Sequence, residues 1–476
     1  MKFTFEKLGA LDYGELDLAD LTVVCGENNS GKTYVAHAIY GWMAFMQPGA
    51  FSYGDWLLPD GSVQALRAGT AVQLDLRQLW SDRREAFWNA ADTAYRSLLP
   101  EVLAVRPEML AETRVGFAHP EVGESVFDDA PHVMTKPLRP GLALQAERFG
   151  TALTLGWVGD PVLARELASD DIILVLAGMM RGLMCIDSVF PVPFVASAER
   201  ADVMLFREAV NLARARAWQL PEARGPDAGL FEERAMHMPG EPARWYEYAY
   251  PWSVRNNLDL LNQLQGLVQR RAPLLDGQGD LLDGFEDIVG GQYSIGEAGV
   301  RFAPRGSTGS LGMSESSSSV RALAIVGLYL RHLAAPGDLF MIDEPELNLH
   351  PANQRRFARL LARLVNAGVK VFMTTHSDYI VKEFNTLLML GQQTPHTGQV
   401  REKHGYRDDE PLTVDQVKLY TCGPAKVRRP GEKRSKRINT LTPAPIDAQL
   451  GIEVATFDAT IDAMNEIQDE LLYGGS

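Results

Sequence analysis

One short segment constrains this chain more than any other. Residues 26–33 read Gly-Glu-Asn-Asn-Ser-Gly-Lys-Thr, a spacing of glycine, lysine and threonine that lets a loop wrap a phosphate group. Apolar residues at 21–25 precede this segment, and from Tyr34 they recur at helical spacing. A strand, a loop and a helix in this order surround a phosphate with backbone N–H groups and the positive end of a helix. The order therefore predicts an α/β fold that binds a nucleotide.

The residue types of this segment give each position an expected role. Glycines allow the loop to curl, Lys32 is expected to reach the β- and γ-phosphates, and Thr33 is expected to ligate Mg²⁺. The residues expected to bind the nucleotide are Gly26, Asn28, Asn29, Ser30, Gly31, Lys32 and Thr33. A glycine-rich turn with an incidental lysine is the alternative, and the flanking strand and helix argue against it.

A second group of polar residues follows apolar stretches much later in the chain. Residues 339–342 are apolar and end at Asp343 and Glu344. Ligands of parallel sheets bind at the C-terminal ends of strands, so Asp343 is expected to coordinate Mg²⁺ and Glu344 to polarise the attacking water. An acidic pair that only begins a solvated loop is the alternative. His376 follows another apolar stretch at 369–373 and is either a sensor of the γ-phosphate or a structural histidine.

The spacing of these motifs and the sequences of several segments resemble those of one class of ATPase. Lys32 and Asp343 are too far apart for a compact GTPase or kinase, so the site is assembled from both chain ends. The segments that carry the resemblance are GENNSGKT, MSESSSSVRALAIVGLYL, LFMIDEPELNLHP and VFMTTHSD, supported by VASAER at 195–200 and GGQY at 290–293. Together they resemble the ABC-class ATPases of the SMC/RecF type. The phrase EPELNLHP is most similar to the OLD-like (overcoming-lysogenization-defect) branch, many of whose members act in defence against phage.

The resemblance implies that a second subunit completes the site. In such ATPases a signature segment of one subunit contacts the γ-phosphate held by the other. When this segment is aligned with the family's signature motif, Ser317 corresponds to the signature serine. Ser318 and Ser319 occupy positions where the family usually has glycines. Hydroxyl groups at a helix N-terminus can still face a phosphate. A flexible serine linker is the alternative. The same resemblance places Asn348 and His350 in the D-loop across the dimer interface.

The change of pattern along the chain predicts three regions. Residues 1–45 and 286–385 are expected to form an ABC-type ATPase head, 46–285 an α-rich insertion, and 386–476 a small C-terminal α+β region. Expected elements of the head are a hairpin at 290–302 and helices at 320–333 and 352–366. Expected helices elsewhere lie at 84–98, 172–186, 204–218, 253–271 and 456–472. The chain lacks sustained heptads, and its C-terminal region lacks Asp-x-Asp, so neither a long coiled-coil arm nor a TOPRIM nuclease domain is expected.

The distribution of charge suggests one local contact with a polyanion. The chain has 46 Lys and Arg against 61 Asp and Glu, a net charge of −15, which argues against coating nucleic acid through bulk charge. Basic residues concentrate at Lys426, Arg428, Arg429, Lys433, Arg434, Lys436 and Arg437. This run at 426–437 is the candidate for nucleic-acid contact. A solvated loop without a partner is the alternative, and Pro430 and Gly431 predict a loop.

The remaining features concern location. No apolar run approaches the ~20 residues that span a bilayer, and the N-terminus lacks the basic head and apolar stretch of a secretory signal. A cytoplasmic protein is expected. Cys25, Cys185 and Cys422 are few and widely spaced, which predicts neither a disulfide framework nor a metal site.

These observations favour an ATP hydrolase with ATP and Mg²⁺ as cofactors. The expected catalytic residues are Lys32, Ser317, Glu344 and His376. The resemblance implies a homodimer, or a higher even-numbered oligomer, that closes around ATP. It implies a sensor, scaffold or switch for a separately encoded effector, such as a nuclease or toxin, in antiphage defence. A RecF-like ATPase of DNA repair is the alternative. A transporter subunit is disfavoured, because the motifs are widely split and the signature lacks glycine.

Overall fold

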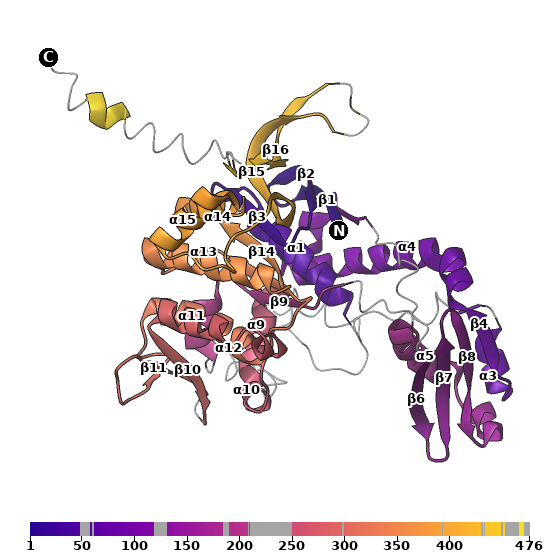
Figure 1. Cartoon of the computed structure of the whole chain (residues 1–476). Coiled ribbons are helices and arrows are strands. Elements are labelled where there is room, and N and C mark those ends of the chain that lie inside the picture. Colours follow the sequence, from indigo (N-terminus) through magenta and orange to yellow (C-terminus); the bar gives the residue numbers. More distant parts are fainter. Residues whose placement is uncertain are drawn as a thin grey trace, which may run out of the picture. The chain divides into compact units, whose positions relative to one another are not determined.

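The chain divides into two compact units, whose elements are labelled in Figure 1. The smaller unit contains Trp42–Leu98 and Phe117–Val192, and the larger unit contains Lys2–Gly41, Leu99–Gly116 and Pro193–Ser476. The structure, a computed structural model, describes residues 1–47, 58–59, 61–118, 131–183, 190–207, 209, 250–297, 299–392, 394–429, 432, 434–448, 451–452 and 466–470. Every residue that the sequence assigns to a nucleotide site lies in the larger unit.

A mixed sheet forms the centre of the larger unit. Its strand order is β5-β1-β2-β16-β15-β3-β14-β13-β9. The strands are β1 (Lys2–Leu8), β2 (Leu11–Asp17), β3 (Leu21–Gly26), β5 (Arg114–Phe117), β9 (Pro193–Ala196), β13 (Leu339–Asp343), β14 (Lys370–Thr375), β15 (Val417–Val427) and β16 (Lys436–Pro443). Strands β15, β3, β14, β13 and β9 run parallel to one another. Their carboxyl ends therefore meet at one edge of the sheet, and the expected α/β fold built from both chain ends is confirmed.

The central strands are buried on both faces. Every residue of β3 and β13 is buried, and in β14 only Lys370 is partly exposed. Leu21, Val23 and Cys25 belong to a core shared with α12, α13 and α14, whereas the intervening Val24 is buried on the opposite face. Near-continuous apolar strands of this kind are typical of parallel sheets that helices cover on both faces. The predicted strands at 21–25, 339–342 and 369–373 are confirmed.

Helices and a small hairpin complete the larger unit. The helices are α1 (Lys32–Phe45), which continues into the smaller unit, α9 (Trp252–Asn262), α10 (Leu264–Leu267), α11 (Asp280–Val289), α12 (Ser318–His332), α13 (Pro351–Asn366), α14 (Asp378–Leu390) and α15 (Pro395–His404). Single turns of 3-10 helix lie at Pro107–Leu110, Pro273–Asp276 and Val414–Gln416. Strands β10 (Gly291–Gly296), β11 (Gly299–Pro304) and β12 (Leu311–Gly312) form a separate antiparallel sheet. The expected hairpin and both expected helices of this region are confirmed.

Helix α12 is held in place by close packing. The ring of Tyr329 stacks on Phe194 of β9 and on Phe340 of β13, with ring centroids 4.5 and 4.9 Å apart. On another side, a Cβ atom at Gly327 would lie 2.7 Å from the ring of Tyr293 in β10. Glycine in the helix interior therefore permits this approach of the hairpin. The packing fixes α12 between β9 and β10.

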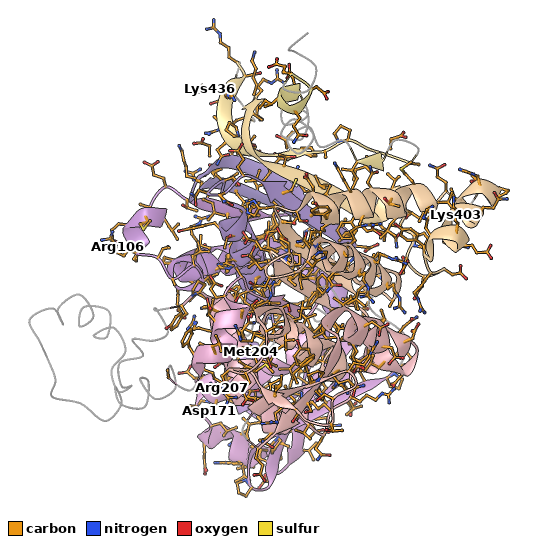
Figure 2. The ribbon with its side chains drawn as sticks, turned by 90° about the vertical axis from the view of Figure 1, so that its left-hand side faces the viewer. Arg106, Asp171, Met204, Arg207, Lys403 and Lys436 are labelled. Atoms are coloured by element: carbon orange, nitrogen blue, oxygen red, sulfur yellow. The ribbon has the colours of Figure 1, made fainter. Side chains whose placement is uncertain are left out.

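The C-terminal strands complete the sheet that the N-terminal strands begin. Strands β15 and β16 pair antiparallel and lie between β2 and β3, and Figure 1 shows their hairpin extending beyond the sheet. Lys426 pairs with Arg437 and Val427 with Lys436, so the two ends of the basic run lie on strands, where the sequence predicted only a loop. Lys436 is labelled on this hairpin in Figure 2. Residues 430, 431 and 433 of the run lie outside the described residues.

Two short strands follow the hairpin, β17 (Ile446–Asp447) and β18 (Gly451–Ile452). Of the helix expected at 456–472, only residues 466–470 are described, and they are helical. Within the part of the chain that the structure describes, no helix is both long and apolar enough to cross a membrane.

The smaller unit contains an antiparallel sheet that the sequence analysis did not predict. Its strand order is β4-β8-β7-β6, from β4 (Val72–Asp75), β6 (His132–Arg139), β7 (Leu142–Phe149) and β8 (Ala152–Gly159). Its helices are α3 (Ser62–Arg67), α4 (Leu76–Val102), which continues into the larger unit, and α5 (Ser169–Leu183), with a 3-10 helix at Pro161–Glu166. Buried positions alternate along β7, but one of them is Ala146 and another Arg148, so the strand's apolar signal is weak.

The expected helices of this region correspond only in part to the observed ones. Helix α4 is longer than the predicted 84–98, and α5 begins before the predicted 172–186. The single helix predicted at 253–271 is two helices, α9 and α10, because Gln263 leaves helical geometry between them. Most of the helix predicted at 204–218 lies outside the described residues.

Candidate nucleotide-binding site

The glycine-rich loop connects β3 to α1, as the sequence predicted. Gly26 ends the strand with φ 143°, and Gly31 precedes the helix with φ 107°. A Cβ atom at residue 26 would lie 2.2 Å from the carbonyl oxygen of Cys422 in β15, so only glycine fits against this strand. Asn29 adopts a left-handed backbone with φ 61°. The loop thus takes the tight curl that a phosphate-binding loop requires.

Lys32 is folded over this loop. Its Nζ atom donates to the carbonyl oxygens of Gly26 at 3.0 Å and Glu27 at 2.7 Å. The side chain is buried, and burial lowers the pKa of Lys32 although nearby carboxylates oppose the shift. The ammonium group therefore lies against the loop, in contact with two of its carbonyl oxygens.

Two residues of the β15–β16 hairpin form hydrogen bonds to the glycine-rich loop at 26–33. The carbonyl oxygen of Ser30 accepts a hydrogen bond from Asn439 Nδ2 at 2.8 Å and another from Cys422 Sγ at 3.2 Å. Asn439 Nδ2 also donates to the carbonyl oxygen of Ala10 at 2.7 Å. The sequence analysis assigned no role to Asn439 and neither a disulfide nor a metal site to Cys422, since nothing in their local pattern points to a loop about 400 residues away.

Asp343 lies at the carboxyl end of β13 with one oxygen free for a ligand. Its Oδ1 atom accepts a hydrogen bond from the hydroxyl of Thr374 in β14. Its Oδ2 atom is buried and has no partner among the described residues. Buried carboxylate oxygens are normally satisfied, so an unpartnered one at a strand end fits a cation ligand. The hydroxyl of Thr33, in the first turn of α1, is half-buried and would supply a second oxygen.

Glu344 and His376 are brought together by neighbouring strand ends. His376 Nε2 lies 3.1 Å from Glu344 Oε1, and both side chains are about a quarter exposed. Glu344 has φ 48°, and its N–H group donates to the carbonyl and hydroxyl oxygens of Thr374, each at 3.2 Å. A left-handed glutamate held by its backbone presents its carboxylate in one direction, and the histidine orients it further.

A partly buried carboxylate, that of Glu346, holds His376 in position. Glu346 Oε1 accepts from the backbone N–H of His376 at 2.5 Å, and its Oε2 accepts from the hydroxyl of Thr375 at 2.9 Å. Burial raises the pKa of Glu346. This residue ties the turn after β13 to the end of β14. Its importance was not recognised from the sequence, although it lies in the EPELNLHP phrase.

Arg200 lies beneath this turn in the VASAER segment and is fully buried. Its guanidinium donates to the carbonyl oxygens of Asp343 at 2.6 Å and Glu344 at 2.8 Å. Burial lowers the pKa of Arg200 to about 10, which leaves it charged at neutral pH. Sequence analysis used this segment only as support for a resemblance.

The serine-rich segment begins α12 and faces solvent. Ser317 is the N-cap, and its Oγ accepts from the N–H of Val320 at 3.4 Å. Ser317 and Ser318 are exposed, whereas Ser319 is partly buried and its hydroxyl lies 3.0 Å from that of Ser317. No hydrogen bond between described residues joins these serines to the chain's own loop at 26–33. Asn348 and His350 are also exposed, and His350 caps α13.

Comparisons with known proteins found one matching protein family and several similar solved structures. A protein family described as "AAA domain, putative AbiEii toxin, Type IV TA system" matches residues 224–382, about a third of the chain. The matched range contains Ser317, Asp343, Glu344 and His376 but not the phosphate loop. No curated protein sequence matches the chain.

Several solved structures are similar to the chain at low scores. The SMC head domain from Thermotoga maritima shares 11% identity at a TM-score of 0.30, covering 94% of this chain and 98% of that one. An Smc head domain with an extended coiled coil, bound to the C-terminal domain of ScpA and derived from Pyrococcus furiosus, shares 12% identity at a TM-score of 0.32, covering 98% of each chain.

Proposed function

We propose that this chain is a Mg²⁺-dependent ATPase that closes into a dimer around ATP. One observation carries the proposal: the phosphate loop, the unpartnered oxygen of Asp343 and the Glu344–His376 pair all lie at the carboxyl ends of adjacent parallel strands. Ligands of open parallel sheets bind at this edge. The residue types provide a phosphate cradle, a cation ligand and a base, which together are the parts of a phosphoryl-transfer site.

Each residue has a distinct task in the proposed reaction. Lys32 exchanges its bonds to loop carbonyls for bonds to the β- and γ-phosphates. Thr33 and Asp343 would hold Mg²⁺, which when bound neutralises charge on the phosphate oxygens. Glu344 accepts a hydrogen bond from the attacking water and polarises it. His376 keeps the Glu344 carboxylate in place. Because Glu344 would lie next to the γ-phosphate, His376 is also placed to sense that phosphate.

The proposed dimer is supported by surfaces that the single chain leaves exposed. The hydroxyls of Ser317 and Ser318 stand at the N-terminus of α12, where the helix favours negative charge. They form no hydrogen bond to the chain's own loop among the described residues. A second copy of the chain would bring its phosphate to these hydroxyls, and two-fold symmetry would create two such sites.

We further propose that the dimer acts as a switch for a separate effector, such as a nuclease or toxin, in antiphage defence. Two observations support this role. The sequence resembles the OLD-like branch, and the family that matches residues 224–382 is described by a putative toxin of a type IV system. The residues after His376 contain no Asp-x-Asp of the kind that a TOPRIM nuclease site needs.

An ATPase that binds DNA in the manner of RecF is the second candidate. The observation in its favour is the exposed basic end of the β15–β16 hairpin. Stimulation of hydrolysis by DNA alone, without any partner protein, would favour this candidate. Stimulation or inhibition only by a protein encoded beside this chain would favour the effector switch.

Two substitutions test the ATPase. Lys32→Ala should abolish ATP binding, because the β- and γ-phosphates lose their counter-charge. Glu344→Gln should keep ATP binding but lower hydrolysis by at least about a hundredfold, the usual contribution of a positioned base. Phosphate release with and without Mg²⁺, together with equilibrium ATP binding, measures both effects.

The matched control is Glu402→Gln on the exposed face of α15, which makes the same chemical change away from the site. It should hydrolyse ATP at the parental rate. Parental turnover by Glu344→Gln would show that another group polarises the water, and no hydrolysis by the unmodified chain would overturn the ATPase.

A further inference from the structure

Arg200 is an unusual residue because its charge is fully buried and forms no ion pair among the described residues, although nearby carboxylates such as Asp343 and Glu346 favour its charged form. The side chain is 0% exposed and follows β9. Buried guanidinium groups ordinarily pair with a carboxylate. Among the described residues, however, every hydrogen bond of Arg200 goes to a backbone carbonyl oxygen. Burial of a charged group is energetically unfavourable, so the contacts of this guanidinium indicate its role.

The guanidinium of Arg200 joins three separate elements. Nε donates to Ala322 in α12 at 2.8 Å, and Nη1 donates to Ser197 after β9 at 3.0 Å. Nη1 also donates to Asp343 at 2.6 Å, and Nη2 donates to Glu344 at 2.8 Å. Four of the five N–H groups of the arginine are therefore used. The planar, forked geometry of the group fixes the directions of all these bonds.

Two of the three elements joined by Arg200, α12 and the turn at Glu344, are those that serve ATP in the proposed dimer. Ala322 lies about one helical turn beyond Ser317, the N-cap that the partner's phosphate would meet. Glu344 polarises water in the chain's own site, and its left-handed backbone is held by Arg200 at its carbonyl and by Thr374 at its N–H group. One side chain thus connects the base of one site to the signature serine of the other.

We propose that Arg200 is a positioning residue that couples the two composite ATP sites of the dimer. The inference rests on the proposed dimer. Hydrogen bonds near 2.8 Å weaken steeply when they are stretched or bent. If the Glu344 turn shifts when a γ-phosphate binds, α12 can move with it and all hydrogen bonds of Arg200 are kept. If α12 does not move, at least one hydrogen bond of the buried guanidinium breaks. Because breaking that bond is costly, the displacement passes to α12 and to Ser317.

Lysine cannot replace this arrangement. Its ammonium is a compact group with three donors and lacks the rigid fork that reaches Ala322 and Glu344 together. Arg200→Lys should therefore keep a positive charge near Asp343 and Glu344 but release α12 from the turn. The effect should reach the partner's site, which a purely local structural role for Arg200 would leave unchanged.

The test uses mixed dimers purified through a different affinity tag on each subunit. In the reference dimer, one subunit carries Glu344→Gln and the other is unmodified, so only the unmodified subunit's base is active. In the test dimer, Arg200→Lys is added to the Glu344→Gln subunit. The active site then keeps its own Arg200, Lys32 and Glu344. Only the Ser317 presented to it comes from the altered subunit.

We expect ATP hydrolysis by the test dimer to fall about tenfold below the reference dimer, with ATP affinity within about twofold. Arg363→Lys in the same subunit is the matched control, because Arg363 is also buried but pairs with the carboxylates of Asp280 and Asp409. Turnover with this control should equal the reference. Thermal unfolding of each subunit shows whether the two substitutions destabilise the chain to a similar extent.

The possible outcomes separate the inference from the proposal beneath it. Equal turnover in the test and reference dimers would overturn the proposed coupling, because it would show that the effect of Arg200 is limited to its own subunit. Failure of the unmodified chain to hydrolyse ATP or to dimerise would instead overturn the proposed function. If the Arg200→Lys subunit does not fold, Arg200→Gln replaces it, because the neutral amide leaves no unpaired buried charge. The same comparison of turnover then decides.

Discussion

At the scale of single residues, the phosphate loop depends on side chains that come from elsewhere in the chain. The ammonium of Lys32 rests on the carbonyls of Gly26 and Glu27, and the Ser30 carbonyl is held by Asn439 and Cys422. The curl of the loop is therefore stabilised before any nucleotide arrives. A pre-formed loop binds phosphate without first ordering its backbone, which saves conformational entropy.

Gly26 provides a stability prediction at this scale. We expect Gly26→Ala to lower the free energy of unfolding by at least about 2 kcal/mol, because it combines an unfavourable positive φ with a clash against a buried strand. The new Cβ would lie 2.2 Å from the Cys422 carbonyl oxygen. Urea unfolding measures the difference. Gly423→Ala is the control, since a Cβ there has no heavy atom within 4 Å. Equal midpoints for both variants would contradict the prediction.

At the scale of elements, the β15–β16 hairpin has two different ends. Its base pairs with β3 and β2 and supports the phosphate loop. Its far end carries Lys426, Arg428, Arg434 and Arg437, which are exposed and form no ion pair among the described residues. Lys436, by contrast, pairs with Glu432 at 3.0 Å. The hairpin is thus the place where a polyanion would meet this acidic chain.

The hairpin prediction concerns salt dependence. If the chain binds duplex DNA, the logarithm of affinity should fall against the logarithm of salt concentration with a slope of about −0.9 per phosphate contact. Replacing Lys426, Arg428, Arg434 and Arg437 with serine should flatten that slope, because fewer counterions are released. ATP hydrolysis should persist, since none of the four touches the loop at 26–33.

Binding titrations at several salt concentrations test this prediction. Arg106→Ser combined with Lys403→Ser is the control, since both residues are exposed basic side chains outside the hairpin (Figure 2). The control should keep the parental slope. If the quadruple variant keeps the parental slope, the basic run is a solvated surface that does not contact DNA, and any DNA contact lies elsewhere.

At the scale of the whole molecule, the proposed nucleotide site takes its groups from a single edge of the sheet, and the proposed signature serine is not among them. The loop, Asp343, Glu344 and His376 gather at one edge, whereas Ser317 is exposed at the start of α12. A ligand bound between two copies stabilises their interface by mass action. The mass of the assembled protein should therefore depend on ATP whenever hydrolysis is blocked.

The whole-molecule prediction uses the Glu344→Gln protein, which should retain ATP. Light scattering should show a monomer without ATP and a dimer with ATP and Mg²⁺. Adding Ser317→Trp should weaken the dimer while each subunit still binds ATP, because the bulky ring occupies the place of the partner's phosphate. A monomer under both conditions would rule out the proposed dimer, and an ATP-dependent dimer that tolerates Ser317→Trp would rule out this serine as the contact.

Much of the α/β fold and the composition of the candidate site were predictable from the amino-acid sequence. The glycine spacing at 26–33 and the acidic pair at 343–344 are local patterns, and short apolar strands before each one predict a parallel sheet. Strand ends of a parallel sheet share one edge, so the meeting of Lys32 with Asp343 followed without any knowledge of the intervening chain. The same periodicity predicted α12 and α13, because their buried faces repeat at helical spacing.

Other features were decided only by the tertiary structure. Asn439 supports Ser30, and Arg200 joins α12 to Glu344, because strand order and helix packing place them side by side; no local pattern marks an asparagine or an arginine for such contacts. The sheet of the smaller unit also escaped prediction, since a strand such as β7, with few large apolar residues, has a weak period-two signal. Sequence periodicity reports which face of an element is buried, but the partner of each buried polar group is set by neighbours that are distant in the chain.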